Sequence, residues 1–590
     1  MFDPRIYRAA LLPAVIAFVV LMFSFEPIPS PLPPPVATPT FDGSEAARTA
    51  RSIVALAPDR TPGSAGDSAV ADLVEERFSG IEGGQVSTQS FDSSFEGEDV
   101  KLENVILTLP GTSVRTILVL AARDSAEGQG ATTSASATAT LLALADDLGH
   151  SRRNRTLVFA STDGGSDGTE GADHLVDALP DPGVVDEALV ISQPGVPEPQ
   201  APFVIGSGSG ADTPSAQLVQ TARDIATAKF EQRDPSPGPW VGLSRLAFPA
   251  GLGEQVALRR AGIETLAISA HGERRVPSGD DVSEAISSET LAAAGGTMLD
   301  LILTLDHADA PAAGPEDYIR VGGNLVPGWT LSLLAVALLL APLLTAGDTW
   351  LREHRADWRV RKTLFWAAER VLIPLAGLLL TYLLGFVGLI PDPAFPYDPA
   401  LHSAGAAGPV AFAVLAGAVA LAALLVRPMR TPLDAEPQTL AAAAGLLTGI
   451  SVLGIWLVNP YLALLLAPTA HVWLFAARAA GPPRAVVLAT FAVVSLVPAL
   501  LAFATWASEL DLGVSAPWHL LLMVADGQTG FLLALLWCGV LGGLIAVVSA
   551  AGANSRQLPP IGPRGSIRGA GSHAGPGALG SSPPAVRRHT

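Results

Sequence analysis

Polar residues stand directly behind two apolar, strand-like runs of this sequence. Asp124 and Ser125 follow the run 116–121, and Asp163 follows the run 156–160. In an α/β protein the residues just after the strands gather at one edge of the sheet, where such proteins place their chemistry. Carboxylates there could act as a general base or bind a cation. Taken by themselves, Asp124 and Asp163 are more simply explained by capping and turn hydrogen bonds, which is the interpretation we favour.

Histidine and cysteine offer little further catalytic or metal-binding chemistry. The single cysteine, Cys538, excludes an internal disulfide and any cysteine-rich zinc site. Of the histidines that precede residue 318, only His271 lies near the end of a predicted strand, and we expect it in a surface loop. The acidic pair at 280–281 is more typical of a solvated helix start than of a cation site.

The composition indicates that part of the chain lies in a membrane. Hydrophobic residues make up 49% of the 590 residues, charged residues make up 15%, and the mean hydropathy is +0.40. These values are too apolar for a purely soluble protein, so a lipid bilayer is an expected partner. The formal net charge of -19 argues against nucleic acid as a partner, because binding phosphates needs concentrated lysine and arginine.

The N-terminal apolar run predicts a membrane anchor. It covers residues 9–25 behind Arg5 and Arg8 and ends without a typical cleavage site, so we expect residues 1–25 to remain as an anchor. A cleaved signal peptide is the alternative. Residues 26–40 are rich in proline and are expected to form a stiff linker.

A second apolar region begins after residue 325. Its seven apolar runs predict a seven-span membrane domain at 326–550, with spans at 326–346, 364–390, 409–426, 440–458, 461–477, 485–506 and 531–550. Residues 551–590 are rich in glycine, proline and serine, and are expected to form a disordered cytoplasmic tail.

Basic residues predict the orientation. They concentrate in the loops 352–362, 427–430 and 478–484, whereas the alternate loops 391–408 and 507–516 contain none. Short loops rich in arginine and lysine stay in the cytoplasm, so both termini are expected there. This would place residues 26–325 outside a cytoplasmic (plasma) membrane.

The region 41–318 has the pattern of an α/β domain. Strand-like runs at 104–109, 116–121, 156–160, 188–192 and 265–269 alternate with helix-like stretches, which predicts a mixed, mostly parallel sheet between helices. The membrane region by contrast is predicted to be all-α.

Several short motifs of this domain resemble the co-catalytic di-zinc aminopeptidases. They are Arg60-Thr-Pro-Gly-Ser64, Glu103-Asn-Val-Ile, Leu109-Pro-Gly111, Ile117 to Ser125, Gly130-Ala131 and Leu157-Val-Phe159. This family includes bacterial leucyl aminopeptidases, glutamate carboxypeptidase and the endoplasmic reticulum metallopeptidase, whose C-terminal half also spans a membrane. The resemblance covers most of residues 48–305 and implies the same α/β fold.

The resemblance also locates a zinc site, but its positions carry other residues here. The general base of the family falls at Gly165, which has no side chain to accept a proton. The metal ligands of the family fall at Ala122, Thr133, Ser166, Ser192 and Arg275. None of these supplies an imidazole, a thiolate or a carboxylate, which are the groups that bind zinc. The residues that keep the family's motifs are Asp124, Ser125, Gly130, Ala131, Asp163 and Gly164.

These substitutions predict a catalytically inactive pseudopeptidase without a metal cofactor. We expect it to act as an extracytoplasmic binding or scaffolding module for an unknown peptide or protein ligand. One alternative is an active membrane metallopeptidase, in which zinc would occupy a displaced site. A second alternative is a transporter or lipid-handling bundle that the outer domain regulates.

Overall fold

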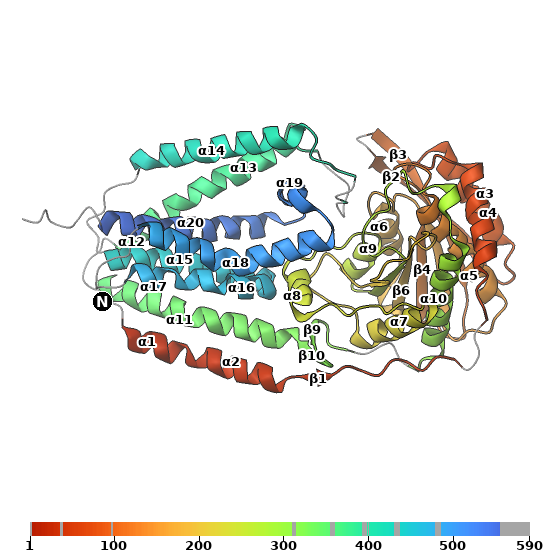
Figure 1. The fold of residues 1–590 in the computed structure, drawn as a ribbon, viewed down its shortest axis with the longest axis horizontal. Coiled ribbons are helices and arrows are strands. Elements are labelled where there is room, and N and C mark those ends of the chain that lie inside the picture. Colours follow the sequence, from red (N-terminus) through yellow and green to blue (C-terminus); the bar gives the residue numbers. More distant parts are fainter. Residues whose placement is uncertain are drawn as a thin grey trace, which may run out of the picture.

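The computed structural model describes residues 3–35, 39–95, 98–309, 314–354, 360–391, 398, 401–429, 437–477 and 485–554. These residues form an α/β domain at one end of the molecule and a helical bundle at the other (Figure 1). The tail predicted at 551–590 lies outside the described residues beyond Asn554, where the last helix ends.

The α/β domain is built on a seven-stranded mixed sheet with strand order β2-β3-β5-β4-β6-β8-β7. The central strands β5, β4, β6 and β8 run parallel to one another, and β3 and β7 join them antiparallel. The strands are β2 (Gln85–Phe95), β3 (Glu98–Leu109), β4 (Thr116–Ala122), β5 (Thr156–Thr162), β6 (Val185–Ser192), β7 (Val204–Ile205) and β8 (Glu264–Ser269). The predicted mixed, mostly parallel sheet is therefore confirmed.

Helices cover both faces of this sheet. One face packs against α3 (Gly43–Leu56), α4 (Ala65–Ser79), α5 (Ser136–Gly149), α7 (Ala216–Lys229) and α10 (Ser288–His307). The other face packs against α6 (Glu170–Asp177) and α9 (Gln255–Arg260). Within β4, Ile117 and Val119 belong to the first core and Leu118 to the second, because successive side chains of a strand point to opposite faces. The central strands are thus buried on both faces, as parallel strands between helices usually are.

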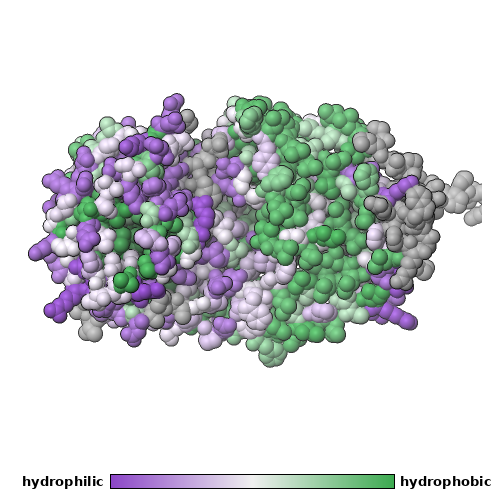
Figure 2. Space-filling view, turned by 180° about the vertical axis from the view of Figure 1, so that it is seen from behind, coloured by the Kyte–Doolittle hydropathy of each residue, from purple (hydrophilic) through white to green (hydrophobic). Residues whose placement is uncertain are grey.

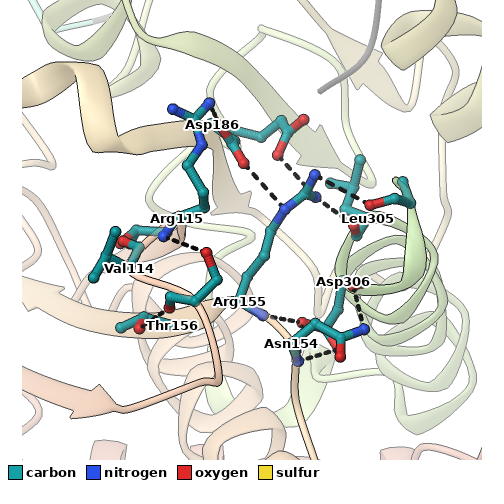
Figure 3. Close-up of polar contacts among 12 residues, drawn as sticks. Val114, Arg115, Asn154, Arg155, Thr156, Asp186, Leu305 and Asp306 are labelled. Carbon is teal, nitrogen blue, oxygen red and sulfur yellow. Dashed lines mark hydrogen bonds and ion pairs between the residues drawn. The ribbon is translucent and has the colours of Figure 1, made fainter. Parts of the chain in front are cut away.

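A polar network ties α10 to the amino-terminal edge of the sheet (Figure 3). The Nε of Arg155 lies 3.0 Å from Oδ2 of Asp186, and its Nη1 donates to the carbonyl of Leu305 at the end of α10. Asp306 in turn accepts a 2.7 Å hydrogen bond from the backbone N–H of Arg155.

The bundle contains the elements predicted to lie in the membrane. Its helices are α1 (Pro4–Ala10), α2 (Leu12–Phe23), α11 (Gly328–His354), α12 (Val360–Ala368), α13 (Leu372–Phe386), α14 (Ala407–Met429), α15 (Pro437–Val458), α16 (Pro460–Leu466), α17 (Trp473–Ala476), α18 (Ala485–Glu509), α19 (Ala516–Ala525) and α20 (Phe531–Asn554). Figure 2 shows a broad apolar surface over this bundle and a mixed, mostly polar surface over the α/β domain.

Seven helical segments among the described residues are long and apolar enough to cross a membrane. They comprise 4–23 and six of the seven segments predicted after residue 325. The remaining segment, predicted at 461–477, consists of α16 and α17 with a 3₁₀ turn at Ala467–His471 between them. Pro468 in this turn has no N–H to continue the helical ladder. The broken segment packs against α15 and α18, and its crossing remains a prediction.

Two structures join the α/β domain to the bundle. The first is a small antiparallel sheet of β1 (Glu26–Pro27), β10 (Asn324–Pro327) and β9 (Tyr318–Val321), which pairs the chain after α2 with the chain before α11. The second is α8 (Pro239–Ala247), which lies against α16 and α18 (Figure 1). Trp240 donates to Oγ1 of Thr505 at 2.9 Å, and Asn459 donates to the carbonyl of Leu246 at 2.9 Å.

Candidate functional site

A cleft of about 150 Å³ opens at the carboxyl ends of β4, β5, β6 and β8. This is the edge at which parallel α/β proteins bind their ligands. Its lining includes all the positions at which the family resemblance implies a zinc site and its general base, namely Ala122, Thr133, Gly165, Ser166, Ser192 and Arg275. The structure therefore brings these positions together.

The turn after β5 is held by a carboxylate from the end of β4. Asp124 accepts hydrogen bonds from the backbone N–H groups of Gly165 and Ser166, both at 3.0 Å, and another from the Ser166 hydroxyl. Gly164, with a φ of +73°, permits the sharp turn that places these N–H groups. Asp124 thus has the turn-binding role predicted for it, and Ser166 uses its hydroxyl within the protein.

Gly165 has no room for the side chain of a general base. A Cβ atom on this residue would lie 2.7 Å from Cβ of Ala122 and 2.9 Å from the carboxyl of Glu254. Glu254 is only 2% exposed, and neither of its carboxylate oxygens has a hydrogen-bond partner within the described residues. Burial raises the pKa of Glu254 to about 7. The carboxyl of Glu254 therefore lies beside Gly165, and Glu254 does not line the cleft.

Asp163 belongs to a buried ion cluster beneath the cleft. Arg123 is fully buried, and its Nη2 lies 2.7 Å from Oδ2 of Asp67 and 3.2 Å from Oδ2 of Asp163. Burial, together with the charge of Asp67, raises the pKa of Asp163 to about 9. Asp163 also accepts from the backbone N–H of Glu103 at 3.1 Å. Arg123 points into the core, where it joins the end of β4 to α4, and it does not line the cleft.

Thr133, at the family's metal-bridging position, is bound to an acid of the same domain. It lies in a π-helical turn (Ala131–Ala135) that follows Gly130, whose φ is +52°. Its hydroxyl donates to Oδ2 of Asp281 at 2.5 Å, and Thr132 donates to Oδ1 through its N–H and hydroxyl. Asp281 is 5% exposed, so the expectation of a solvated helix start at 280–281 is wrong for this residue. Three donors offset the cost of its burial.

Arg275 brings a cation to the position of the family's last ligand. Its Nη1 donates to the carbonyl of Ser166 at 2.9 Å and lies 3.2 Å from Oδ2 of Asp398. Asp398 belongs to the chain between α13 and α14, so a residue of the bundle half lines the cleft. Ser192, the last residue of β6, also lines the cleft, while the neighbouring Gln193 adopts a φ of +47°.

Two further acids near the cleft, Asp167 and Glu170, were not identified from the sequence. Burial raises the pKa of Asp167 to about 6 and that of Glu170 to about 7. Both follow the altered motif after β5, in a stretch without regular spacing of polar residues. Their proximity to the cleft depends on the turn at residues 163–168, which no sequence pattern predicts.

The side chains in the cleft do not fit a zinc ion. Zinc needs three or four nitrogen, sulfur or carboxylate ligands that converge on one point. Among the described residues, no three histidine, cysteine, aspartate or glutamate side chains are grouped in a way that could hold an ion. The cleft instead contains the guanidinium of Arg275, and Thr133 and Asp281 bind each other.

Comparison with known proteins identifies the family of the α/β domain. Residues 104–302 match the model of peptidase family M28. No curated protein matches the sequence significantly. Similar solved structures include a zinc aminopeptidase from Bacillus subtilis, with 14% identity over 48% of this chain and 100% of its own, and a TM-score of 0.38.

Two other similar structures come from different bacteria. A glutaminyl cyclase from an Acidobacteriales bacterium has 17% identity over 46% of this chain and 98% of its own, with a TM-score of 0.35. A Zn-dependent exopeptidase from Parabacteroides distasonis has 18% identity over 45% of this chain and 99% of its own, with a TM-score of 0.34. The matched residues run from β3 into α10 and contain the whole set of altered positions. Residues 104–302 of this chain thus match peptidase family M28, and we call the α/β domain that contains them the M28 domain.

Proposed function

We propose that this protein is a catalytically inactive member of peptidase family M28, in which the altered domain serves as a binding or scaffolding module on a membrane bundle. The observation that carries this proposal is the packing around Gly165. The space that a general base would need is taken by Ala122 and by the buried carboxyl of Glu254. Without a base beside a metal-bound water, the hydrolytic mechanism of such enzymes has no proton acceptor.

The contact with Asp398 supports a scaffolding role. The mouth of the cleft is partly occupied by a residue of the bundle half, and Arg275 is paired with it. Binding of a peptide in the cleft would have to compete with this contact. We therefore expect the cleft to take part in holding the two halves of the protein together, with its ligand a peptide or protein that contacts both.

Zinc content and peptidase activity test this proposal. The full chain, purified in a mild detergent without added metal, is expected to contain well below one zinc per chain by mass spectrometry of metals. It is also expected to release no amino acid from N-terminally free peptides, with or without added zinc. Stoichiometric zinc together with EDTA-sensitive hydrolysis would establish the alternative of an active metallopeptidase with a displaced site and would overturn the proposal.

The membrane orientation is part of the same proposal. We propose a multi-pass protein of the cytoplasmic membrane with both termini in the cytoplasm and residues 26–325 outside, because the basic loops alternate along the chain. A Cys538→Ser, Glu82→Cys variant is expected to react in intact cells with a thiol reagent that does not cross membranes, because position 82 is exposed. Labelling only after lysis would show the opposite orientation.

A further inference from the structure

A second cavity, of about 350 Å³, lies where the M28 domain meets the bundle. Its walls come from α7, α8 and β9 on the domain side and from the end of α18 on the bundle side. Apolar side chains dominate the lining, among them Val241, Leu246, Phe248 and Trp506. A cavity of this size falls within the range of small-molecule sites and is far larger than a single bound water needs.

Two buried arginines of this cavity lie on one serine, and only one of them is paired with an acid within the described part of the chain. Arg223 and Arg320 are 8% and 7% exposed, and both donate to the hydroxyl of Ser236, at 2.9 Å and 3.2 Å. Among the described residues, the single acid that pairs with either guanidinium is Asp234, which lies 3.5 Å from Nε of Arg223. The buried group therefore holds two positive charges against one negative charge. Burial, and after it the charge of Arg320, lowers the pKa of Arg223, as expected for an undercompensated pair.

The other charges of the lining are paired elsewhere. Arg245 lies 3.3 Å from Glu273 and 3.2 Å from Glu509, so two carboxylates face this one guanidinium. Asp212 is paired with Arg259. The local excess of positive charge is thus found only at the corner formed by Arg223 and Arg320, and the charges of the whole lining balance.

Four buried donors in the lining of this cavity have no hydrogen-bond partner among the described residues. They are Nη2 of Arg320, Nε1 of Trp506, Oγ of Ser207 and Nε of Arg223, the last of which lies 3.5 Å from Oδ2 of Asp234. A buried donor without a partner costs about 1–3 kcal/mol, and more when it is charged. An uncompensated buried guanidinium is stable when an anion occupies the space beside it. The same corner opens onto apolar walls, so the occupant needs an apolar part as well.

We propose that this junction cavity binds one anionic amphiphile, with a phosphate or carboxylate head against Arg320 and Arg223 and an apolar body against Phe248 and Trp506. The occupant is either an anionic lipid of the adjoining bilayer leaflet or a soluble amphiphile of the same chemistry. It stabilises the junction because it contacts the M28 domain and α18 at once.

The test uses the full chain in dodecyl maltoside, with native mass spectrometry for bound lipid and thermal unfolding for soluble ligands. The lipid probes are phosphatidylglycerol and phosphatidylcholine of equal chain length. The soluble probe is decyl phosphate below its micelle concentration, with inorganic phosphate as its head-group control. Arg320→Gln removes one unpartnered donor, and Arg77→Gln, at an exposed arginine of α4, is the matched control. Ser236→Asp places a carboxylate between the two arginines, so it fills the site from within.

The wild type and Arg77→Gln are expected to retain one phosphatidylglycerol in preference to phosphatidylcholine, or to be stabilised by decyl phosphate more than by inorganic phosphate. The first result would identify the occupant of the cavity as a lipid, and the second would identify it as a soluble ligand. Arg320→Gln is expected to weaken this binding by about tenfold, as loss of a charged hydrogen-bonding partner does. Without ligand, Ser236→Asp is expected to unfold at a higher temperature than the wild type, and it is expected to show no response to the lipid and phosphate probes. This variant therefore tests the proposal even if Arg320→Gln does not fold.

Three results would overturn the proposal. One is equal retention of the two lipids together with no effect of decyl phosphate. Another is equal stabilisation by decyl phosphate and inorganic phosphate with no preference between lipids. The third is a response that Arg320→Gln and Ser236→Asp leave unchanged.

Discussion

Arg275 of the M28 domain and Asp398 of the bundle half form an ion pair, with Nη1 and Oδ2 3.2 Å apart, at the mouth of the cleft. The two side chains are 20% and 18% exposed, so water screens the pair only in part. Arg275, at a position where the family resemblance implies a metal ligand, thus provides a contact between the two halves of one chain.

Breaking this pair is expected to loosen the cleft locally. We expect Arg275→Gln to raise the opening equilibrium of the segment 272–278 about fivefold, because a partly exposed ion pair contributes about 1 kcal/mol. Hydrogen exchange measured on peptides from this segment checks the prediction. The control is Arg274→Gln, because Nη1 of Arg274 lies 3.9 Å from the largely exposed Asp511. Equal effects of the two variants would contradict a specific role for Arg275.

Restoring the general base alone is expected to damage the fold and not to create activity. Gly165→Glu would force its Cβ against Ala122 and Glu254, and overpacking of this kind costs about 1–3 kcal/mol. Thermal unfolding and a peptide-hydrolysis assay measure the two effects. Gly279→Ala is the control, because a Cβ there would meet nothing within 4 Å. A stable Gly165→Glu variant with peptidase activity would contradict this prediction and would show that one substitution restores catalysis in the cleft.

The buried acid at Glu254 predicts a pH-dependent stability. Its pKa is raised from 4.5 to about 7 in the folded protein, so the folded state binds more protons than the unfolded state between these values. Stability is therefore lost as the pH rises through this window. Relative to the wild type, Glu254→Gln should gain up to about 3 kcal/mol between about pH 5 and about pH 8. Denaturant unfolding at both pH values checks this, with the exposed Glu82→Gln as the control that should not show the gain.

The ion cluster beneath the cleft is expected to be the most sensitive site of the domain. Arg123→Met leaves Asp67 buried without its cation, beside Asp163, whose raised pKa favours its neutral form, and breaking a buried pair in this way costs about 3–5 kcal/mol. Thermal unfolding of the purified variant, or its yield where it does not fold, measures the loss. Adding Asp67→Asn should recover most of the stability, because the carboxylate that lost its partner is then neutral. If stability is not recovered, its loss in Arg123→Met is caused by altered packing and not by uncompensated charge.

Much of the α/β fold could be predicted because its strands are continuous apolar runs. The run predicted at 116–121 is β4 with one more residue, and the run at 156–160 is β5 with two more. The long hairpin of β2 and β3 was predicted only in part, at 104–109. Its remaining residues alternate polar and small side chains, which do not distinguish an exposed strand from a loop.

The candidate site could be predicted where it follows a motif, but not where it depends on distant segments. The motif positions Ala122 and Gly165 meet in the cleft as expected. Glu254 and Asp398 were missed, because each lies in a loop far along the chain from the strands it approaches. Asp281 was assigned to solvent, because an acidic pair before a helix is usually solvated and its three donors come from residues about 150 positions earlier.

The small sheet of β1, β10 and β9 has a mechanical consequence. Glu26 pairs with Leu325, so the chain enters and leaves the M28 domain through adjacent strands, and the helices on either side, α2 and α11, pack together. The domain is in effect inserted between two neighbouring helices and held by a double-stranded stalk. Such a stalk resists twisting, whereas a single tether would let the domain swivel. A protease cut in only one of the two strands should leave the domain attached, still facing the bundle through α8.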